Sequence, residues 1–318
     1  MSYTAIAIFP ALVVSAGGTA MGALLVGLLG ATAVVLVVAG RGDGQPPADP
    51  GTDGYRAFLA ARDGRADLLR HTLARREAFF DGLARERLVA QYRPDRETFA
   101  RNLARHRPEP GSDQRMLWLL ATAKANQAER FGVGLAELYG KLDPGDPVRV
   151  HIALQEHYHT RILSDVVETF GLTVHPKPPR FVARAIVKIL VATPERWNLP
   201  LTGATEMAGC VIFRLLRDRG VELFADDPRV AARVRLLYDE ILGDEIGHVG
   251  YIAGVLGPQG RRVMRVLYRL LGLRLATQLP ELVALVGRRE LARRFAAEFR
   301  LDAMAAELPG RAYAAATI

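Results

Sequence analysis

The chain has 318 residues, which is enough for one large domain with appended segments or for two modest domains. Its formal net charge is +8, but the basic residues are spread along the sequence and do not form a block, so a nucleic-acid-binding protein is not expected. Cys210 is the single cysteine, which excludes an internal disulfide framework and is compatible with a reducing compartment.

Residues 1–40 contain no charged side chain. Within them, residues 21–39 form an apolar run long enough, as a helix, to cross a hydrocarbon core of about 30 Å. A cleaved signal peptide would have a basic start and a shorter apolar region, and this segment has neither. Positive charge begins at Arg41, so the positive-inside rule predicts a single-pass transmembrane anchor, with the N-terminus outside and the rest of the chain in the cytoplasm.

The segments on either side of the main domain differ in composition. Residues 41–54 are rich in Gly, Pro and Asp and are predicted to form a flexible linker. Residues 55–111 are heavily charged and are predicted to form amphipathic helices near 55–80 and 96–106. Residues 257–318, rich in Arg and Leu, are predicted to form accessory helices.

Residues 112–256 have the apolar spacing that is typical of α-helices, and no strand-like alternation of any length occurs in the sequence. Ser112 is the predicted N-cap of the first helix, which is expected to stop at Gly140. The predicted helices that follow are 148–170, 181–192, 201–219 and 228–256. The sequence therefore predicts an all-α fold with four long helices and an extra apolar helix between the second and the third.

Two of these helices carry the motif Glu-x-x-His, as Glu156-x-x-His159 and Glu245-x-x-His248. Positions i and i+3 of a helix lie on the same face, so the carboxylate and the imidazole can reach one metal ion. Each motif falls on the apolar stripe of its helix, where an unpaired carboxylate is costly to bury and a metal ion removes that cost. We therefore predict that both motifs bind metal.

The other two long helices each offer one glutamate. Glu129 lies on a stripe of small residues, at a similar distance from the connecting loop to Glu156, whereas Glu137 faces charged residues and fits a surface ion pair. Glu206 is isolated among apolar residues in the interior of its helix. Any one of these residues alone also fits a helix-end glutamate or a hydrogen-bonded core histidine. The joint order Glu, Glu-x-x-His, Glu, Glu-x-x-His favours a two-metal site.

Polar residues directly precede both motifs. Asp244 is placed to accept a hydrogen bond from the free ring N–H of His159, and Gln155 could do the same for His248. Such contacts orient an imidazole for metal binding. An ordinary polar flank is the alternative for both residues.

These residues resemble the ligand set of the ferritin-like diiron-carboxylate superfamily, in particular its oxidoreductase or oxygenase branch. Residues 112–256 carry the resemblance, and the matching positions are Glu129, Glu156, His159, Glu206, Asp244, Glu245 and His248. The resemblance implies a ferritin-like four-helix bundle in which two iron ions activate dioxygen for hydroxylation, desaturation or N-oxygenation. Oxygen and imidazole ligands also suit manganese. The arylamine N-oxygenases carry one more histidine, at the position of Ile241 in this chain.

The leading hypothesis from the sequence is a membrane-anchored diiron oxidoreductase that acts on a small or lipophilic organic substrate with dioxygen. A ferritin-like ferroxidase or peroxide-scavenging protein is the second hypothesis. The third is a membrane scaffold whose bundle binds no metal.

Overall fold

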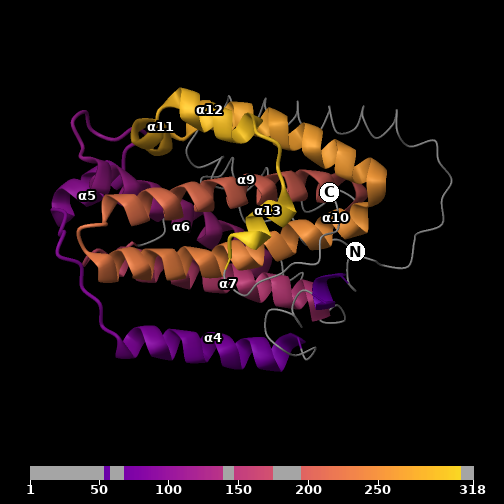
Figure 1. The fold of residues 1–318 in the computed structure, drawn as a ribbon, viewed down its shortest axis with the longest axis horizontal. Helices are drawn as coiled ribbons and strands as arrows, with labels where there is room; N and C mark the ends of the chain where they lie inside the picture. The colour runs from indigo at the N-terminus through magenta and orange to yellow at the C-terminus, as the bar shows by residue number, and fades with distance from the viewer. Residues whose placement is uncertain (1–53, 58–67, 139–146, 175–194, 309–318) are drawn as a thin grey trace.

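A computed structural model of the chain describes residues 54–57, 68–138, 147–174 and 195–308 (Figure 1). Every regular element within these ranges is a helix, so the all-α prediction is confirmed for the described part of the chain. The labelled helices are α4 (Leu68–Arg85), α5 (Arg96–Leu103), α6 (Gln114–Leu138), α7 (Pro147–Glu168), α9 (Glu195–Leu223), α10 (Pro228–Gln278), α11 (Pro280–Val286), α12 (Arg288–Ala296) and α13 (Leu301–Ala306).

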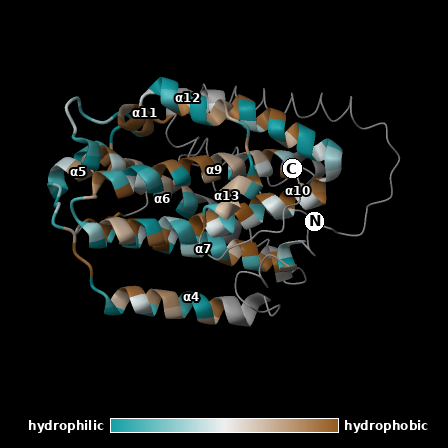
Figure 2. Ribbon diagram, viewed as in Figure 1, coloured by the Kyte–Doolittle hydropathy of each residue, from teal (hydrophilic) through white to brown (hydrophobic). Residues whose placement is uncertain are grey.

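Four long helices, α6, α7, α9 and α10, pack together in the centre of the molecule (Figure 1). α9 contacts α10 and α6, and α7 contacts α6 and α10, so each helix has two neighbours within the set. Figure 2 shows that the long helices carry both hydrophilic and hydrophobic residues, as expected of amphipathic helices that share a core.

The remaining helices cover this central set. α4 packs on α7, and α5 packs on α6. α11 lies against α6 and α10, while α12 and α13 pack on α10. The segments before and after the central helices therefore contact the four helices that carry the predicted metal ligands.

An aromatic cluster ties three of the central helices together. The Trp118 ring lies edge-on to Phe224 and Tyr238, with ring centroids 5.3 and 6.1 Å away, and Phe170 lies 5.9 Å from it. The indole Nε1–H of Trp118 donates to the backbone oxygen of Leu216 at 2.7 Å. These contacts fix α6, α9 and α10 side by side at a layer two to three helical turns from their glutamates.

The start of α6 differs from the prediction by one residue. Asp113, not Ser112, is the cap, because its carboxylate accepts a hydrogen bond from the backbone N–H of Met116 at 2.8 Å. The Ser112 hydroxyl instead donates to the backbone oxygen of Glu109 at 2.9 Å, in the preceding turn. Both residue types form caps, and only the local turn decides between them.

The helix α9 is longer than the predicted range 201–219, because it begins at Glu195 and runs through Pro200. Proline in the second turn removes one backbone hydrogen bond. Leu199 and Leu201 on either side of it are 5% and 2% exposed, and their burial offsets that loss.

The predicted stop before Gly257 corresponds to a sharp kink in α10. Gly257 has φ +64° and ψ −175°, a backbone conformation that side chains disfavour, and Pro258 follows it. The parts of α10 before and after Gly257 are therefore two separate helices joined at a kink, as the Gly-Pro pair predicts.

One helix within the described ranges, Leu199–Leu223 of α9, is long and apolar enough to cross a membrane by length and composition. Its most apolar window is 83% buried inside the protein, which is the behaviour of a core helix. The predicted anchor over residues 1–40, residues 41–53 of the predicted linker 41–54 and the apolar helix 181–192 lie outside the described residues, and they stay predictions.

Candidate metal centre

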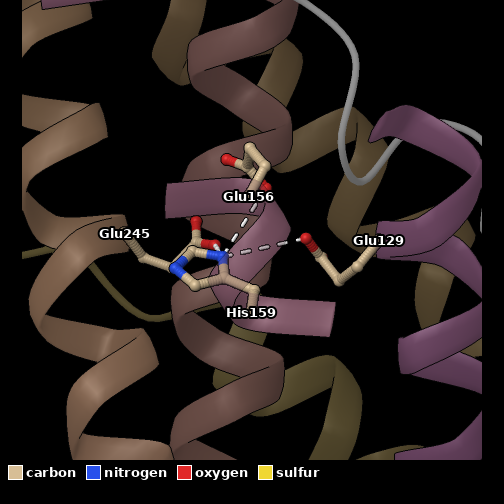
Figure 3. A group of neighbouring side chains, drawn as sticks. All are labelled: Glu129, Glu156, His159 and Glu245. Atoms are coloured by element: carbon tan, nitrogen blue, oxygen red, sulfur yellow. Dashed lines mark ion pairs between the residues drawn. The ribbon is translucent and has the colours of Figure 1, made fainter. Parts of the chain in front are cut away.

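The structure brings the six predicted metal ligands together from four helices. They form two groups in which one ligand atom from each residue lies within 4.8 Å of the others, and Figure 3 shows the group that contains His159. The first group is Glu129, Glu156, His159 and Glu245, and the second is Glu156, Glu206, Glu245 and His248. Because Glu156 and Glu245 belong to both groups, the arrangement is that of two adjacent cation sites with two shared carboxylates.

Helical spacing explains why these side chains converge. α7 and α10 each present a Glu and a His one turn apart on the face toward the core, while α6 and α9 each present one Glu. Five of the six residues are buried, and Glu156 is the most accessible, with 12% of its side chain exposed. His157, between the two ligands of α7, is exposed, as its position on the helix predicts.

The imidazoles point one ring nitrogen at the glutamates. His159 Nδ1 lies 3.3 Å from Glu245 Oε1, 3.5 Å from Glu156 Oε2 and 3.8 Å from Glu129 Oε2 (Figure 3). His248 Nδ1 lies 3.3 Å from Glu156 Oε1 and 3.6 Å from Glu206 Oε2.

None of these approaches satisfies the hydrogen-bonding capacity of the cluster. The buried atoms that have no hydrogen-bond partner include Glu129 Oε2, Glu156 Oε2, His159 Nδ1, Glu206 Oε2, both carboxylate oxygens of Glu245, and His248 Nδ1. An unsatisfied buried polar atom costs on the order of 1–3 kcal/mol, so several in one place call for a missing partner. These seven atoms belong to the six predicted ligands, and a pair of cations between them would satisfy all seven.

The opposite nitrogen of each imidazole is held by a hydrogen bond. His159 Nε2 lies 3.2 Å from Asp244 Oδ2, and His248 Nε2 lies 3.0 Å from the amide oxygen of Gln155. Gln155 in turn donates its side-chain N–H to Asp244 Oδ1 at 2.7 Å. A carboxylate and an amide oxygen only accept hydrogen bonds, so both Nε2 atoms carry the proton. In the neutral form of each ring, Nδ1 then has its lone pair toward the glutamates, and this is the form in which imidazole binds a metal.

An arginine outside the four central helices completes this network. Arg76 of α4 is fully buried and donates to the carboxylates of Asp244 and Glu240, the latter at 3.0 Å. Arg75 also donates to Glu240 at 3.0 Å. The sequence analysis assigned residues 55–111 to a separate segment and missed both arginines. The signal was an arginine on the apolar stripe of its helix, four residues before Phe80.

Tyr55 is a further residue whose role was not predicted from the sequence. It is fully buried, and its hydroxyl donates a hydrogen bond to the Gln155 amide oxygen, which also accepts from His248. Its ring lies 5.8 Å from the rings of His151 and Tyr251. The start of the charged segment thus reaches the residues that orient the imidazoles.

No basic side chain that the structure describes offsets the carboxylates of the cluster. Within the described residues, none of the four glutamates forms an ion pair with a lysine or an arginine. Arg75 and Arg76 pair instead with Glu240 and Asp244, and those four charges cancel. If all four carboxylates are ionised and both imidazoles are neutral, two divalent cations would neutralise the charge of the cluster.

Burial and the closeness of the four carboxylates also shift the pKa values of the predicted ligands. Burial, followed by repulsion from Glu156, raises the pKa of Glu129 to about 8. Burial, followed by repulsion from Glu206 and other carboxylates, raises the pKa of Glu245 well above its usual range. Although burial acts to lower it, the facing Glu156 and Glu206 raise the pKa of His248 to about 9. The cluster attracts positive charge, either as protons or as metal ions.

The sequence matches no protein-family model, and no curated protein or solved structure matches it. The geometry of the cluster is therefore the basis for a functional assignment.

Proposed function

We propose that the protein is a membrane-anchored diiron-carboxylate oxidoreductase that uses dioxygen to oxidise a small or lipophilic organic substrate. The observation that carries this proposal is the pair of adjacent four-residue groups that share Glu156 and Glu245. We assign the central helices to a ferritin-like four-helix bundle on the same basis.

The donor set fits two iron ions, with manganese as the other metal that carboxylate and imidazole ligands suit. His159 and Glu129 would hold one ion, His248 and Glu206 the other, and Glu156 and Glu245 would lie between them. Two such ions, when bound, would supply the redox chemistry needed to reduce dioxygen with electrons from a donor. Cys210, one turn from Glu206, is buried, and burial raises the pKa of its thiol, so it does not contribute a thiolate.

The chain's own residues fix the geometry and exclude water. Asp244 and Gln155 hold the Nε2–H of each imidazole, which keeps both Nδ1 atoms directed at the cluster. Apolar side chains one helical turn from the ligands, such as Ile241, Ile252 and Leu163, are buried and limit the access of water to the site. Ile241 stands where an arylamine N-oxygenase would have a further histidine, so we favour carbon oxidation over N-oxygenation.

A ferritin-like ferroxidase or peroxide-scavenging protein is the alternative. The observation that favours it is the 12% exposure of the Glu156 side chain, which leaves one shared carboxylate in partial contact with solvent. The unsatisfied ligand atoms argue against the third possibility, a scaffold that binds no metal.

The membrane location in this proposal depends on the sequence of residues 1–40. Their apolar run would hold the enzyme at a bilayer, where lipophilic substrates are concentrated, with the catalytic domain on the cytoplasmic side.

Oxygen consumption separates the two catalytic functions. Full-length protein in detergent, loaded with iron and supplied with a chemical reductant, is expected to consume dioxygen faster when a lipophilic substrate is added, and to place oxygen atoms or a double bond in that substrate. Consumption that depends on added Fe(II) or peroxide and ignores organic compounds would establish the alternative. The Glu245→Gln variant should be inactive, whereas Glu222→Gln, at an exposed position on α9, should match the wild type.

A further inference from the structure

The part of α10 after the kink, residues 258–278, is a basic helix. Its sequence contains five arginines and no aspartate or glutamate. The helix lies along an outer edge of the molecule, beside α12 (Figure 1). Figure 2 shows both hydrophilic and hydrophobic residues along this stretch. The arrangement of these residues on the helix shows what kind of partner its outer side fits.

The inner side of this helix is fixed in the core. Met264 and Leu267 are buried. Met264 packs so closely on Gly203 of α9 that its sulfur occupies the place where a Cβ at Gly203 would lie. Gly203 is one turn before Glu206, so the helix rests on the part of α9 that carries a predicted ligand. Because its inner side is packed, the helix cannot turn about its axis, and the residues opposite stay directed outward.

The outer face of the helix, formed by Arg262, Arg265, Val266, Arg269 and Leu270, combines positive charge with apolar surface. All five side chains are exposed, Val266 by 49% and Leu270 by 45%. Among the exposed large apolar side chains in the described ranges, these two alone lie one turn apart on a single helix. The outer face therefore places a small apolar strip beside three arginines.

The three arginines of the outer face have no acidic partner. Within the part of the chain that the structure describes, Arg262, Arg265 and Arg269 form neither an ion pair nor a side-chain hydrogen bond. Several other exposed arginines do pair with nearby carboxylates: Arg101 and Arg105 with Glu109, Arg293 with Glu290, and Arg300 with Asp302. The charge of the outer face is thus available to an anion from outside the molecule.

Arginines beside exposed aliphatic side chains fit an anionic lipid surface. Val266 and Leu270 can enter the boundary between headgroups and acyl chains while the arginines stay at the level of the lipid phosphates. Nucleic acid would attract the arginines but leave both apolar side chains in water, and the outer face has no aromatic side chain for stacking on bases. A symmetric contact with a second copy would bring like charges together.

We propose that the outer face binds the surface of an anionic lipid bilayer, with its arginines on lipid phosphates and with Val266 and Leu270 inserted beside them. This contact is separate from the predicted anchor of residues 1–40 and would give the protein a second attachment. It would also place α9, which carries Glu206, one helix away from the bilayer. The arrival of a lipophilic substrate from that side rests on the proposed function, whereas the lipid contact does not.

A fluorescent dye attached at position 270 tests the contact in the full-length protein. Cys210 is buried, so a thiol-reactive dye labels Leu270→Cys selectively. The labelled protein is reconstituted in vesicles whose lipids carry a nitroxide quencher near the headgroup, made of phosphatidylcholine alone or of equal parts phosphatidylcholine and phosphatidylserine. We expect strong quenching in the mixed vesicles and weak quenching in the neutral ones. Added salt should reverse the quenching in the mixed vesicles, because it screens the arginines.

Leu236→Cys is the matched control for the position of the dye. Leu236 is also 45% exposed, and it lies on α10 before the kink. Its dye should stay unquenched in both kinds of vesicle. No quenching at position 270 in the mixed vesicles, or equal quenching at both positions, would overturn the proposal. A dye at position 270 that responds to added duplex DNA and not to lipid would overturn it as well, in favour of nucleic acid.

Charge variants of the labelled protein test the role of the arginines. Changing Arg262, Arg265 and Arg269 together to Gln should lower the ratio of docked to undocked molecules about 100-fold, at roughly fivefold per arginine. Changing the same three residues to Lys keeps the charge and should leave docking unchanged. Undiminished docking of the Gln variant, or lost docking of the Lys variant, would refute an electrostatic contact. No step uses metal, dioxygen or an organic substrate, so the outcome is independent of whether the cluster is an oxidoreductase.

Discussion

Replacing Glu245 with Gln should stabilise the metal-free protein and weaken metal binding. Glu245 is fully buried, neither of its carboxylate oxygens has a hydrogen-bond partner, and three other carboxylates surround it. Without a cation the residue must remain as a buried charge or take up a proton. Both states cost free energy, and a glutamine, which is uncharged, avoids that cost.

The size of the effect follows from the cost of protonation. The ordinary pKa of this carboxyl is 4.5, so protonating it at pH 7 costs at most about 3 kcal/mol. Glu245→Gln should therefore raise the unfolding free energy of the metal-free protein by up to ~3 kcal/mol. For a chain of this size that is ~4–5 °C in Tm.

The assay is thermal unfolding of chelator-treated protein, followed by the same measurement with Mn(II) added. The wild type should gain stability from the metal, whereas Glu245→Gln should lose at least ~100-fold in metal affinity and gain little. Glu222→Gln changes an exposed glutamate on α9 and should alter neither quantity by much. A less stable metal-free Glu245→Gln protein, or one with undiminished metal binding, would refute the reasoning.

Three further changes test other parts of the structure. Arg76→Met should destabilise the protein by ~3–5 kcal/mol in denaturant unfolding, because it leaves buried carboxylates unpaired, whereas Arg75→Met, at a partly exposed position, should cost less than ~1 kcal/mol. Burial raises the pKa of Asp165 from 3.8 to about 6, so the folded chain holds this proton more tightly than the unfolded chain. The free energy of unfolding therefore falls as the pH rises between these two values. Asp165→Asn should remove that fall and, after allowance for solvent screening, should raise the free energy of unfolding by ~1 kcal/mol at pH 7. Gly257→Ala should cost ~1–3 kcal/mol through backbone strain alone, since an added Cβ would meet nothing within 4 Å, and an unchanged unfolding midpoint would contradict this.

The position of the six candidate ligands could be predicted because the information is local. Glu156-x-x-His159 and Glu245-x-x-His248 each depend on a spacing within one helical turn. Glu129 followed from the symmetry of a helix pair around a short loop. The hydrogen bonds that hold the imidazoles could also be predicted, because their acceptors, Gln155 and Asp244, directly precede the two Glu-x-x-His motifs. The metals and the chemistry that we assign to this cluster stay proposals.

The residues that the sequence analysis missed act over long separations. Arg76 contacts Asp244 across 168 residues, and Tyr55 contacts Gln155 across 100. No periodicity relates such positions, and an arginine or a tyrosine on an amphipathic helix is more often at the surface. Only the packing of α4 on α7 brings Arg76 into the core. The ion pair between Lys124 of α6 and Glu281 of α11 depends in the same way on the docking of α11.

The most direct test of the central claim is the number of metal ions that the folded chain binds. Full-length protein freed of metal, titrated with Fe(II) without oxygen and then desalted, should retain about two ions per chain, and the Glu156→Gln, Glu245→Gln double variant should retain none tightly. Fewer than two ions in the wild type, or two ions still bound after both shared carboxylates are neutralised, would contradict a two-metal centre built on these side chains.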